Sequence, residues 1–444
     1  MTARIPALLL LATLAACSDG GTSVDIGPPE PVAPAQPTAW LKAHAIPITT
    51  HRPGSGFADL QPVKAIVGDA RIVSLGEATH GTSEFFEMKH RMFEFLVHEM
   101  GFTVFAIEAE WAEALRINEY VQTGRGDAHR LLSGLYFWTW RTPEVLGLIE
   151  WMRAYNANPA NTRKLSFVGI DAQFPTLAMD TTIAFLGRVD PALAASAREN
   201  YACLRPYSND MTGTTRQHYR NVPDSVRLPC FAKVRQVHLD IQANRARIVA
   251  ATSQADYELG LQAARLVVQG EAVRAERWYD VRDLYMAENA AWWLDHSGPG
   301  AKMVIWAHNY HVSTQQPWMG QYLRTQFGPD MRVFGFTFFQ GSFTAVNLDG
   351  GPFGPYTVGP PSTNSYEHLF HTAGLDRFIL DLRPAATDPA AHWLMGPLTT
   401  REMGCCHRPS VSDYGVHSIS LPAAYDAIIH FEHSTATQIL DFIL

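Results

Sequence analysis

The chain carries a glutamate and a histidine three residues apart, Glu77 and His80, within the run Gly-Glu-Ala-Thr-His-Gly at residues 76–81. This run follows an apolar stretch at residues 70–75 and leads into a helical pattern that begins near Ser83. In open α/β sheets, ligands bind at such strand-to-helix turns, because the carboxyl ends of strands and the N-termini of helices meet there. A carboxylate beside an imidazole at this place indicates acid/base chemistry.

Three other strand-like stretches also end in a titratable residue. The residues that follow them are Glu108, Asp171 and His308, after residues 102–107, 165–170 and 303–307 respectively. For any single strand end, an ordinary polar residue of a turn is an alternative explanation. Four such ends together favour a shared acid/base site, because ordinary turns use Asn, Gly and Ser instead.

The sequence lacks two common hydrolase signatures. It has no Gly-x-Ser-x-Gly, which argues against the nucleophile elbow of α/β-hydrolases, and no His-Glu-x-x-His, which argues against the common zinc-protease helix. What remains for hydrolysis of an ester is His80 as a base that acts on water, with Glu77 or Glu108 orienting the ring. A neighbouring carboxylate stabilises the imidazolium that forms when the ring takes a proton.

A second cluster, Trp-Ala-His-Asn-Tyr-His, occupies residues 306–311. His308 and His311 are three residues apart, which places them side by side on a helical turn and on opposite faces of a strand. Either is a candidate donor to a carbonyl oxygen. Two alternatives stay open: with His80 and a glutamate they make a plausible divalent-metal site, or one histidine caps the turn and another packs in the core.

The elements that must position these residues alternate between strand and helix patterns over residues 39–175, which is typical of an α/β unit. Between residues 83 and 100, apolar residues recur at helical spacing, and Gly101 is expected to end that helix. From about residue 175 the alternation lapses. Residues 206–229 are predicted to be rich in loops, and residues 231–296 are almost continuously helical in character.

Strand patterns resume in the last third of the chain, at residues 303–307, 333–337, 378–382 and 427–431. We therefore predict an α/β fold with a mostly parallel central sheet flanked by helices and a helical hairpin inserted into it or lying over it. In this prediction the domain covers residues 39–444 and its helical insertion spans about residues 231–297. Such an addition would form a wall of a substrate cleft.

The first residues are typical of a bacterial export signal. A basic residue and an apolar run too short to span a bilayer precede Leu-Ala-Ala-Cys at residues 14–17, which resembles a lipobox. We therefore predict a lipoprotein signal peptide at residues 1–16, lipidation of Cys17, and a flexible tether at residues 17–38. An ordinary cleaved signal peptide is the alternative. Both place the body in the cell envelope, on the periplasmic or outer-membrane side.

Charge argues against one class of partner. Without residues 1–16, which contain a single basic side chain, the chain keeps 34 basic and 43 acidic side chains, a formal charge of −9. Nucleic-acid binding is therefore not expected. A hydrophobic fraction of 47% is ample for a large core. We expect a monomer that contacts the membrane only through its lipid anchor.

Four further cysteines lie in the body of the chain. In an oxidising compartment, Cys203 and Cys230 are candidates for a disulfide that closes the loop-rich segment. The neighbours Cys405 and Cys406 make a poor zinc site, because they lack the two-residue gap that lets both sulfurs face one metal ion. No cofactor is expected, although a divalent metal at the histidines remains an alternative.

Taken together, the motifs of this chain resemble those of the erythromycin esterase family. The resemblance rests on the run at residues 76–81 with Glu84 and Lys89, Glu108, Trp140-Arg141-Thr142-Pro143-Glu144 with Trp151-Met152-Arg153, Gly169-Ile170-Asp171, Arg282-Asp283 with Met286, Trp306-Ala307-His308-Asn309, Leu421-Pro422 and Tyr425-Asp426-Ala427. It covers nearly all of the mature chain, and the combination is much more specific than any one motif.

The resemblance implies an α/β body with helical additions and a cleft for a macrolide, whose lactone ester is opened by water. It therefore also implies a link to macrolide resistance. By match to the family, His80 is the general base, supported by Glu77 and Glu108. The other site residues that it implies are His308 in catalysis and, in substrate binding, Arg282, His311, Asp171 and Glu84.

Three hypotheses of different classes follow. The first is a metal-independent hydrolase of a cyclic or simple ester. The second is a metal-dependent hydrolase with His80, His308 or His311 as ligands, and the third is a non-catalytic envelope protein that binds a small molecule in its cleft. The presence of Glu77 and Glu108 beside the histidines favours an enzyme over the third hypothesis.

Overall fold

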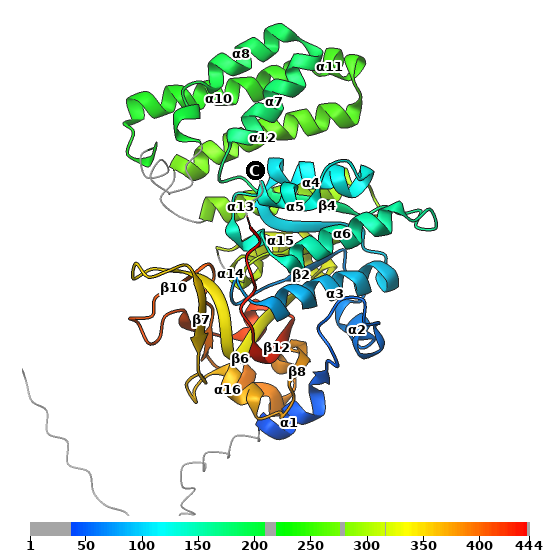
Figure 1. The fold of residues 1–444 in the computed structure, drawn as a ribbon, viewed down its shortest axis with the longest axis vertical. Coiled ribbons are helices and arrows are strands. Elements are labelled where there is room, and N and C mark those ends of the chain that lie inside the picture. The colour runs from blue at the N-terminus through cyan, green and yellow to red at the C-terminus, as the bar shows by residue number, and fades with distance from the viewer. Residues whose placement is uncertain (1–36, 209–218, 276–279, 316, 442–444) are drawn as a thin grey trace, which may run out of the picture. The chain divides into compact units, whose positions relative to one another are not determined.

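A ten-stranded sheet is the centre of the fold (Figure 1). The structure, a computed structural model, describes residues 37–208, 219–275, 280–315 and 317–441. The chain divides into residues 1–35 and residues 36–444, and only the second part is described. The strands of the sheet are β1 (Ile46–Pro47), β2 (Ile72–Leu75), β3 (Val104–Glu110), β4 (Ser166–Asp171), β5 (Met303–Trp306), β6 (Met331–Asn347), β7 (Gly354–Val358), β8 (Arg377–Asp381), β10 (Cys406–His407) and β12 (Ala427–Ser434).

The sheet is mostly parallel, as predicted. Its main path follows the order β1-β8-β12-β6-β2-β5-β3-β4, and β7 and β10 both pair with β6. The six strands from β12 to β4 are parallel to one another, whereas β8, β1 and β7 pair in the antiparallel sense. Strands β2, β3 and β5 are buried along their whole length, which explains their continuous apolar runs.

One strand is much longer than the sequence predicts. The stretch predicted at residues 333–337 is the first half of β6, which continues to Asn347 and pairs with β7 along its second half. That second half was not predicted, because Gly341 and Ser342 interrupt the apolar run. The extension matters for the site, because the end of β6 pairs with β10.

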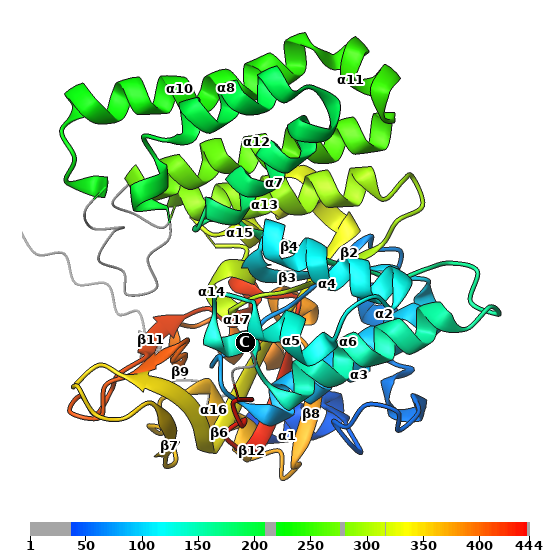
Figure 2. The ribbon, with the colours of Figure 1, turned by 45° about the horizontal axis from the view of Figure 1, so that its top comes forward.

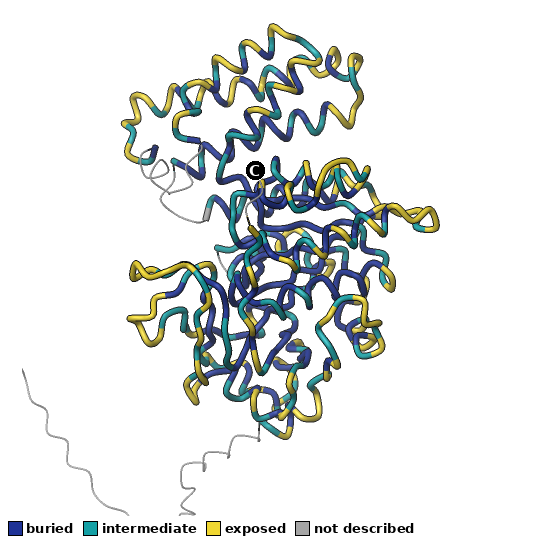
Figure 3. The backbone as a smooth tube through the Cα atoms, viewed as in Figure 1, coloured by how far each residue is buried: buried dark blue, intermediate teal, exposed yellow. Residues whose placement is uncertain are grey.

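Helices cover both faces of the sheet. Alternate residues of β3 belong to different apolar cores: Val104 and Ala106 to one, Phe105 and Ile107 to the other. The main flanking helices are α3 (Ser83–Met100), α4 (Trp111–Thr123), α6 (Pro143–Ala157), α13 (Asp280–His296) and α15 (Met319–Phe327). Helix α3 ends at Gly101, as predicted, where φ is 74°. Figure 3 shows the buried backbone concentrated in and around the sheet.

A group of packed helices forms an additional layer beyond the sheet (Figures 1 and 2). These helices are α7 (Thr176–Val189), α8 (Pro191–Tyr201), α10 (Asp224–Ala243), α11 (Arg245–Ala251) and α12 (Gln254–Ala275). The layer is larger than the predicted hairpin, since α7 and α8 pack with α10 and α12. Helix α10 starts inside the segment predicted to be loop-rich, because it accommodates Pro229 within the helix. Helix α13 instead packs on β4 and α15.

Short elements complete the described part of the chain. They are α1 (Pro37–His44), α2 (Val63–Val67), α5 (Ala128–Ser133), α14 (Asn309–Val312), α16 (Tyr366–His371) and α17 (Leu421–Ala424), the 3-10 helices η1 (Ala58–Leu60), η2 (Trp138–Trp140), η3 (Arg205–Tyr207), η4 (Gly328–Asp330), η5 (Arg383–Ala386) and η6 (Pro389–Leu394), and a separate two-stranded sheet of β9 (Leu398–Arg401) and β11 (Val416–Ile419). Among the described residues, no helix has both the length and the apolar character that a membrane crossing requires.

Two disulfides join the four cysteines of the body. Cys203, which follows α8, is bonded to Cys230 of α10, so the predicted pairing is confirmed. The neighbours Cys405 and Cys406 are bonded to each other, which the sequence analysis did not predict. The predicted signal peptide, tether and lipidated Cys17 lie outside the described residues, except for the last two positions of the tether, which belong to α1.

Candidate active site

The carboxyl ends of four neighbouring strands meet at one edge of the sheet. The order β2-β5-β3-β4 places side by side the four strand ends that the sequence predicts to carry the site. Glu77 and His80 follow β2, Glu108 lies near the end of β3, Asp171 ends β4 and His308 follows β5. Because these strands are parallel, all five residues lie at the same edge.

Glu108 stands in an irregularity of β3. The register between β3 and β4 shifts between Ile107 and Glu110, so β3 continues to Glu110 and does not end at residue 107 as predicted. Such a bulge bends a strand and redirects its side chains. Here the Glu108 carboxylate accepts hydrogen bonds from the Arg282 side chain and from the backbone N–H of His308.

The turn after β2 holds Glu77 and His80 in contact. Oε1 of Glu77 lies 2.5 Å from Nδ1 of His80. The backbone N–H of His80 donates to the carbonyl of Gly404 over 2.9 Å. The turn needs a glycine at position 76, because a Cβ there would lie 2.1 Å from Oδ1 of Asn309. Within the described part of the chain, no hydrogen bond uses Nε2 of His80.

Two more donors fix Glu77 from behind. The carboxylate is fully buried, and its Oε2 accepts the indole N–H of Trp306 over 2.6 Å. The ammonium group of Lys89 donates to the same oxygen. Burial lowers the pKa of Lys89 to about 8, although the Glu77 carboxylate opposes this shift. Two donors therefore converge on one oxygen of this buried carboxylate and hold its other oxygen against His80.

Arg282 is buried between two carboxylates. Its Nη2 donates to Oε1 of Glu108 and to Oδ2 of Asp171, over 2.7 Å in each case. Burial alone would lower the pKa of Arg282, but Asp171 and Glu108 raise it well above its usual value. Burial would likewise raise the pKa of Glu108, but His311 and Arg282 hold it well below its usual range. The guanidinium and the Glu108 carboxylate are therefore both charged.

His311 completes this network. Its Nδ1 lies 2.8 Å from Oδ1 of Asp283 and its Nε2 3.3 Å from Oε1 of Glu108. Burial lowers the pKa of His311, but the two carboxylates outweigh this effect and raise it to about 10. Nδ1 of the ring donates to Asp283, and Nε2 lies at ion-pair distance from Glu108. Nε2 is also within hydrogen-bond distance, 2.9 Å, of Nη1 of Arg282, so Arg282 and His311 both contact the Glu108 carboxylate.

His308 lies at the start of α14 and faces His80, with the two ring centroids 5.1 Å apart. Burial, together with His80 and His311, lowers the pKa of His308 well below its usual value, so the ring is neutral. Nδ1 accepts the backbone N–H of Tyr310 over 3.2 Å, which places the proton of the neutral ring on Nε2. That buried Nε2 has no hydrogen-bond partner among the described residues.

These residues open onto a cleft of about 660 Å³. The residues that line it are His80, Glu108, Phe137, Trp138, Thr139, Trp140, Gln173, Arg282, His308, Tyr310, His311, Leu348, Glu402, Met403, Gly404, Cys405, Cys406, Tyr414 and Gly415. One part of the lining is charged and the other is aromatic or apolar. A volume of this size falls within the range of about 300–1,000 Å³ that is usual for small-molecule sites.

Three predicted site residues do not line the cleft. Glu77 and Asp171 lie behind it, where they hold His80 and Arg282. The structure does not bring Glu84 to the site at all, because Glu84 is in the first turn of α3 and its carboxylate accepts the backbone N–H of Thr435 over 2.7 Å. Glu84 therefore lies apart from the residues that line the cleft.

The sequence analysis missed one acidic residue of the cleft wall, Glu402. Burial raises the pKa of its carboxyl to about 8, against hydrogen bonds from Asn309 and Tyr425 that favour the charged form. Glu402 follows β9 of the separate two-stranded sheet, and no apolar strand pattern was predicted there. No signal in the sequence links this segment to the strand ends.

A metal site is the open alternative for the histidines. Within the ranges that the structure describes, no group of three or more His, Cys, Asp or Glu side chains is arranged to hold a metal ion. Both nitrogens of His311 face carboxylates, and Nδ1 of His80 and of His308 are each within hydrogen-bond distance of a protein atom. Of the nitrogens of these three histidines, only Nε2 of His80 and Nε2 of His308 remain as possible metal ligands.

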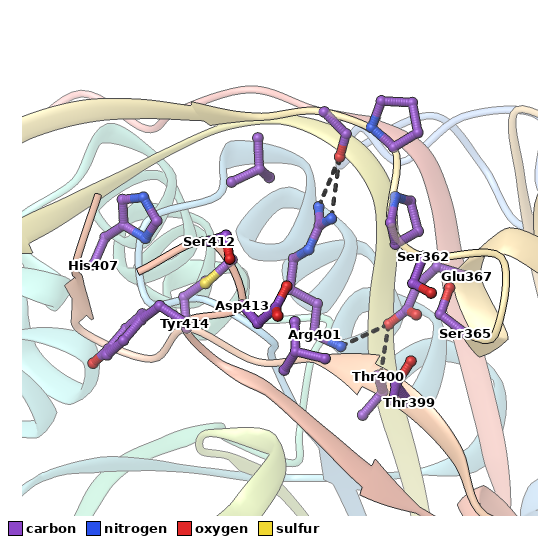
Figure 4. A pocket seen from close by; sticks show the side chains of 16 residues that line it. Ser362, Ser365, Glu367, Thr399, Thr400, Arg401, His407, Ser412, Asp413 and Tyr414 are labelled. Atoms are coloured by element: carbon purple, nitrogen blue, oxygen red, sulfur yellow. Dashed lines mark hydrogen bonds between the residues drawn. The ribbon is translucent and has the colours of Figure 1, made fainter. Parts of the chain in front are cut away.

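A second cavity, of about 220 Å³, adjoins the cleft (Figure 4). Met403 and Tyr414 line both spaces, whereas Arg401 and His407 line only the second. The guanidinium of Arg401 donates to the carbonyl of Gly359, as the dashed lines in Figure 4 show. The segment from Arg401 to His407 therefore has open space on two sides.

Comparison with known proteins identifies relatives of this chain. The family described as erythromycin esterase matches residues 97–434 of this chain. The matched segment contains Glu108, Asp171, Arg282 and His308, whereas Glu77 and His80 precede it. Erythromycin esterase type II of Escherichia coli is 25% identical over 339 residues, which cover 69% of this chain and 78% of that protein.

Solved structures share the fold. A crystal structure of a Bacillus cereus protein superposes with a TM-score of 0.83 at 29% identity, over 93% of this chain and 100% of that one. A mutant of an erythromycin esterase, EreC, in its open conformation superposes with a TM-score of 0.68 at 18% identity, over 90% of this chain and 99% of that one. At this low identity the second likeness shows the fold alone.

Proposed function

We propose that this chain, which belongs to the erythromycin esterase family, hydrolyses an ester by means of a water molecule that His80 deprotonates. The family makes the chain a hydrolase of the esterase type. The base, the attacking water and the substrate are our proposal. The observation that carries it is the 2.5 Å contact between Nδ1 of His80 and Glu77 at the wall of the cleft.

The contact with Glu77 assigns the two ring nitrogens of His80. A carboxylate at Nδ1 holds the proton on that nitrogen, so Nε2 carries the lone pair that accepts a proton from water. The same carboxylate stabilises the imidazolium that results. Lys89 and Trp306 keep Glu77 in place, and the backbone N–H of His80 is fixed by Gly404.

His308 is the candidate donor to the oxyanion. Its neutral ring carries a proton on Nε2, and Nε2 has no hydrogen-bond partner among the described residues. The carbonyl of Ala78 is the competing acceptor, but it already accepts the N–H groups of Met403 and Gly404. A donor that is buried and pre-positioned stabilises a developing negative charge more than a solvated one does.

Arg282 places a fixed positive charge in the cleft wall. Asp171 holds its guanidinium by three hydrogen-bond contacts and Glu108 by one, and the residue is 6% exposed. Because the two carboxylates hold the guanidinium in place and Arg282 lines the cleft, its N–H groups are pre-positioned to orient a carbonyl oxygen. We assign Arg282 to substrate positioning and not to proton transfer, because its pKa is raised well above the usual value.

With these roles, the hydrolysis of the ester balances with water as the only co-substrate. Nε2 of His80 takes a proton from water, and the oxygen of that water forms a bond to the ester carbon. The oxyanion of the tetrahedral intermediate accepts a hydrogen bond from Nε2 of His308. When the bond from carbon to the alkoxy oxygen breaks, the His80 imidazolium returns its proton to the leaving oxygen.

We propose a macrolide lactone as the substrate. The cleft of about 660 Å³ is large enough for a drug-sized molecule, and Phe137, Trp138 and Trp140 give it an aromatic side. An Escherichia coli relative bears the name erythromycin esterase type II. A lactone differs from an open ester in one useful way, because its hydrolysis gives a single product.

The experiment that tests this proposal incubates the purified chain with erythromycin in water enriched in oxygen-18. We expect a single product that is heavier than the substrate by one water and carries one labelled oxygen in its new carboxylate. His80→Asn should abolish product formation, whereas His433→Asn, which changes an exposed histidine of β12, should leave it intact. Product formation at the normal rate in the His80 variant would refute the assignment of the base.

We also propose that Cys17 is lipidated and that the body is anchored in the cell envelope. The support is the Leu-Ala-Ala-Cys run at residues 14–17. Metabolic labelling of the full chain with a fatty-acid analogue should mark the wild type but not Cys17→Ala. A soluble, unlabelled wild-type protein would contradict the anchor and leave the esterase proposal untouched.

A further inference from the structure

Two adjacent cysteines of the cleft wall are joined to each other. Cys405 and Cys406 form a disulfide, and both residues line the cleft. Cys405 is exposed and Cys406 is half-buried, so small molecules reach the bond from the cleft. By contrast, Cys230 of the other disulfide is 3% exposed and neither of its cysteines lines the cleft.

The segment just before this disulfide is hydrogen-bonded to the His80 loop. The N–H groups of Met403 and Gly404 donate to the carbonyl of Ala78 over 2.7 and 3.2 Å. In return, the N–H of His80 donates to the carbonyl of Gly404 over 2.9 Å. The backbone position of Gly404 is therefore coupled directly to that of His80.

Gly404 also lies close to both histidines of the proposed mechanism. A Cβ at this position would lie 3.6 Å from Nε2 of His308 and 4.0 Å from Cδ2 of His80. Its φ of 60° lies in the left-handed region, which glycine adopts without strain. Gly404 thus lies close to the two rings between which, in the proposed mechanism, the ester carbonyl sits.

The segment just after the disulfide is anchored in the main sheet. The carbonyl of Cys405 accepts the N–H of Val346 over 2.9 Å, and β10 pairs with the end of β6. Behind this wall lies the second cavity, lined by Met403 and His407 (Figure 4). Met403 and His407 are buried, whereas Gly404, Cys405 and Cys406 between them are not, so the disulfide ring is a local restraint on the part of the wall that packing holds least.

We propose that the Cys405–Cys406 disulfide holds Gly404 against His80, and that its reversible reduction by a dithiol lowers the esterase activity. The inference rests on the proposed function, and it assigns Cys405 and Cys406 as positioning residues. A bond between adjacent residues closes a small ring and removes backbone freedom at the junction of the catalytic loop and the sheet. Without the disulfide, Gly404 and the backbone of His80, whose N–H donates to the Gly404 carbonyl, can move together into the cleft or the second cavity.

The redox step is a two-electron exchange. A thiolate of the dithiol attacks the more exposed sulfur, that of Cys405, and the sulfur of Cys406 leaves as a thiolate. The second thiol of the reductant then displaces Cys405 and becomes half of a new disulfide. Each cysteine sulfur ends as a thiol with one hydrogen, and the reductant loses two protons and two electrons.

The first test compares activity in the two redox states. Free thiols of the full chain are first blocked with iodoacetamide, and the protein is then treated with dithiothreitol. Alkylation and peptide mass should show Cys405 and Cys406 modified only after reduction. We expect kcat for ester hydrolysis to fall on the order of tenfold on reduction, since small displacements of a catalytic group cost this much or more, and to recover on reoxidation.

The matched control is Cys405→Ser/Cys406→Ser, which keeps only the Cys203–Cys230 bond. We expect this variant to have the low kcat of the reduced wild type and to be insensitive to dithiothreitol. If the variant is as active as the oxidised wild type, the positioning role is refuted. If the variant does not fold, the reduced wild type alone decides the question.

A second readout does not depend on activity. Hydrogen–deuterium exchange at the N–H groups of His80, Gly404 and Val346 reports the bonds on either side of the disulfide, and we expect faster exchange after reduction. Faster exchange without any ester hydrolysis would leave the positioning role standing and sink the proposed function. If both thiols are alkylated and neither the exchange rates nor kcat change, the inference is overturned, whereas the proposed function is not. Alkylation of both cysteines before any reductant is added would also overturn the inference.

Discussion

The rings of His80 and His308 lie 5.1 Å apart at the wall of the cleft, and their Nδ1 atoms have opposite hydrogen-bond roles. Nδ1 of His80 faces the Glu77 carboxylate and donates, whereas Nδ1 of His308 accepts the N–H of Tyr310. The two Nε2 atoms are therefore a proton acceptor and a proton donor. A base for water and a donor for the oxyanion is the pair that ester hydrolysis requires.

This arrangement predicts different effects of two substitutions at His308. His308→Ala removes the donor and should lower kcat about 10²- to 10³-fold, the usual cost of one oxyanion donor. His308→Gln returns an N–H donor near the position of Nε2 and should recover part of that loss. Steady-state kinetics of both variants, beside His80→Asn, checks the prediction. Equal kcat values for the alanine and glutamine variants would show that donation from this position is not used.

Two lysine–glutamate pairs of the chain differ in burial, and this difference predicts how much each pair contributes to the free energy of unfolding. Lys89 and Glu77 are both fully buried, whereas the side chains of Lys64 and Glu99 are 40% and 33% exposed. Lys89→Met leaves a buried carboxylate without its cation and should cost about 3–5 kcal/mol in the free energy of unfolding. Lys64→Met should cost less than about 1 kcal/mol, because water screens that pair.

Urea unfolding of both methionine variants measures this contrast. The two substitutions remove the same ammonium group and keep a similar apolar stem, so the comparison isolates burial. Similar destabilisation by both variants would mean that the Glu77 carboxylate finds compensation from Trp306 and His80 alone.

The strand ends of the site were predictable because strands of a buried parallel sheet have a strong local pattern. The apolar runs before Glu77, Glu108, Asp171 and His308 are short and continuous, and each is followed by a titratable residue. What the sequence did not contain is the strand order. Trp306 and Glu77, which share a hydrogen bond, are 229 residues apart, and no local pattern encodes such a pairing.

The rest of the cleft wall was not predictable for a related reason. Glu402 and the Cys405–Cys406 pair lie in a stretch whose only regular elements are β9, β10 and β11, of two to four residues each. Such short strands have too few residues to show a periodicity. Their place in the fold is set by backbone hydrogen bonds to residues 78–80, which are tertiary contacts.

The hydrogen bonds of the histidines predict that chelators leave the activity unchanged. His311, with a pKa raised to about 10, is protonated near neutral pH and has no lone pair for a metal ion. Nδ1 of His80 is taken by Glu77, so a metal site would have to be built on Nε2 atoms alone. Ester hydrolysis after dialysis against EDTA tests this. A loss of rate that added Zn²⁺ restores would favour the metal-dependent alternative.

Glu402 predicts how stability changes with pH. Burial raises the pKa of its carboxyl from 4.5 to about 8 in the folded chain. Below about pH 4.5 both the folded and the unfolded chain hold this proton, so it contributes no difference. Between the two pKa values only the folded chain holds it, and the free energy of unfolding therefore falls as pH rises towards 8. Above pH 8 the effect is constant.

Glu402→Gln removes this dependence, because an amide is neutral at every pH and its oxygen still accepts from Asn309 and Tyr425. The variant should match the wild type near pH 4.5 and become more stable than it by on the order of 3–5 kcal/mol above pH 8. Urea unfolding across this range measures the difference, in which all other titrating groups cancel. Glu119→Gln, at an exposed glutamate, should give a flat difference. A flat difference for Glu402→Gln as well would show that burial does not raise the pKa of the Glu402 carboxyl in the folded chain.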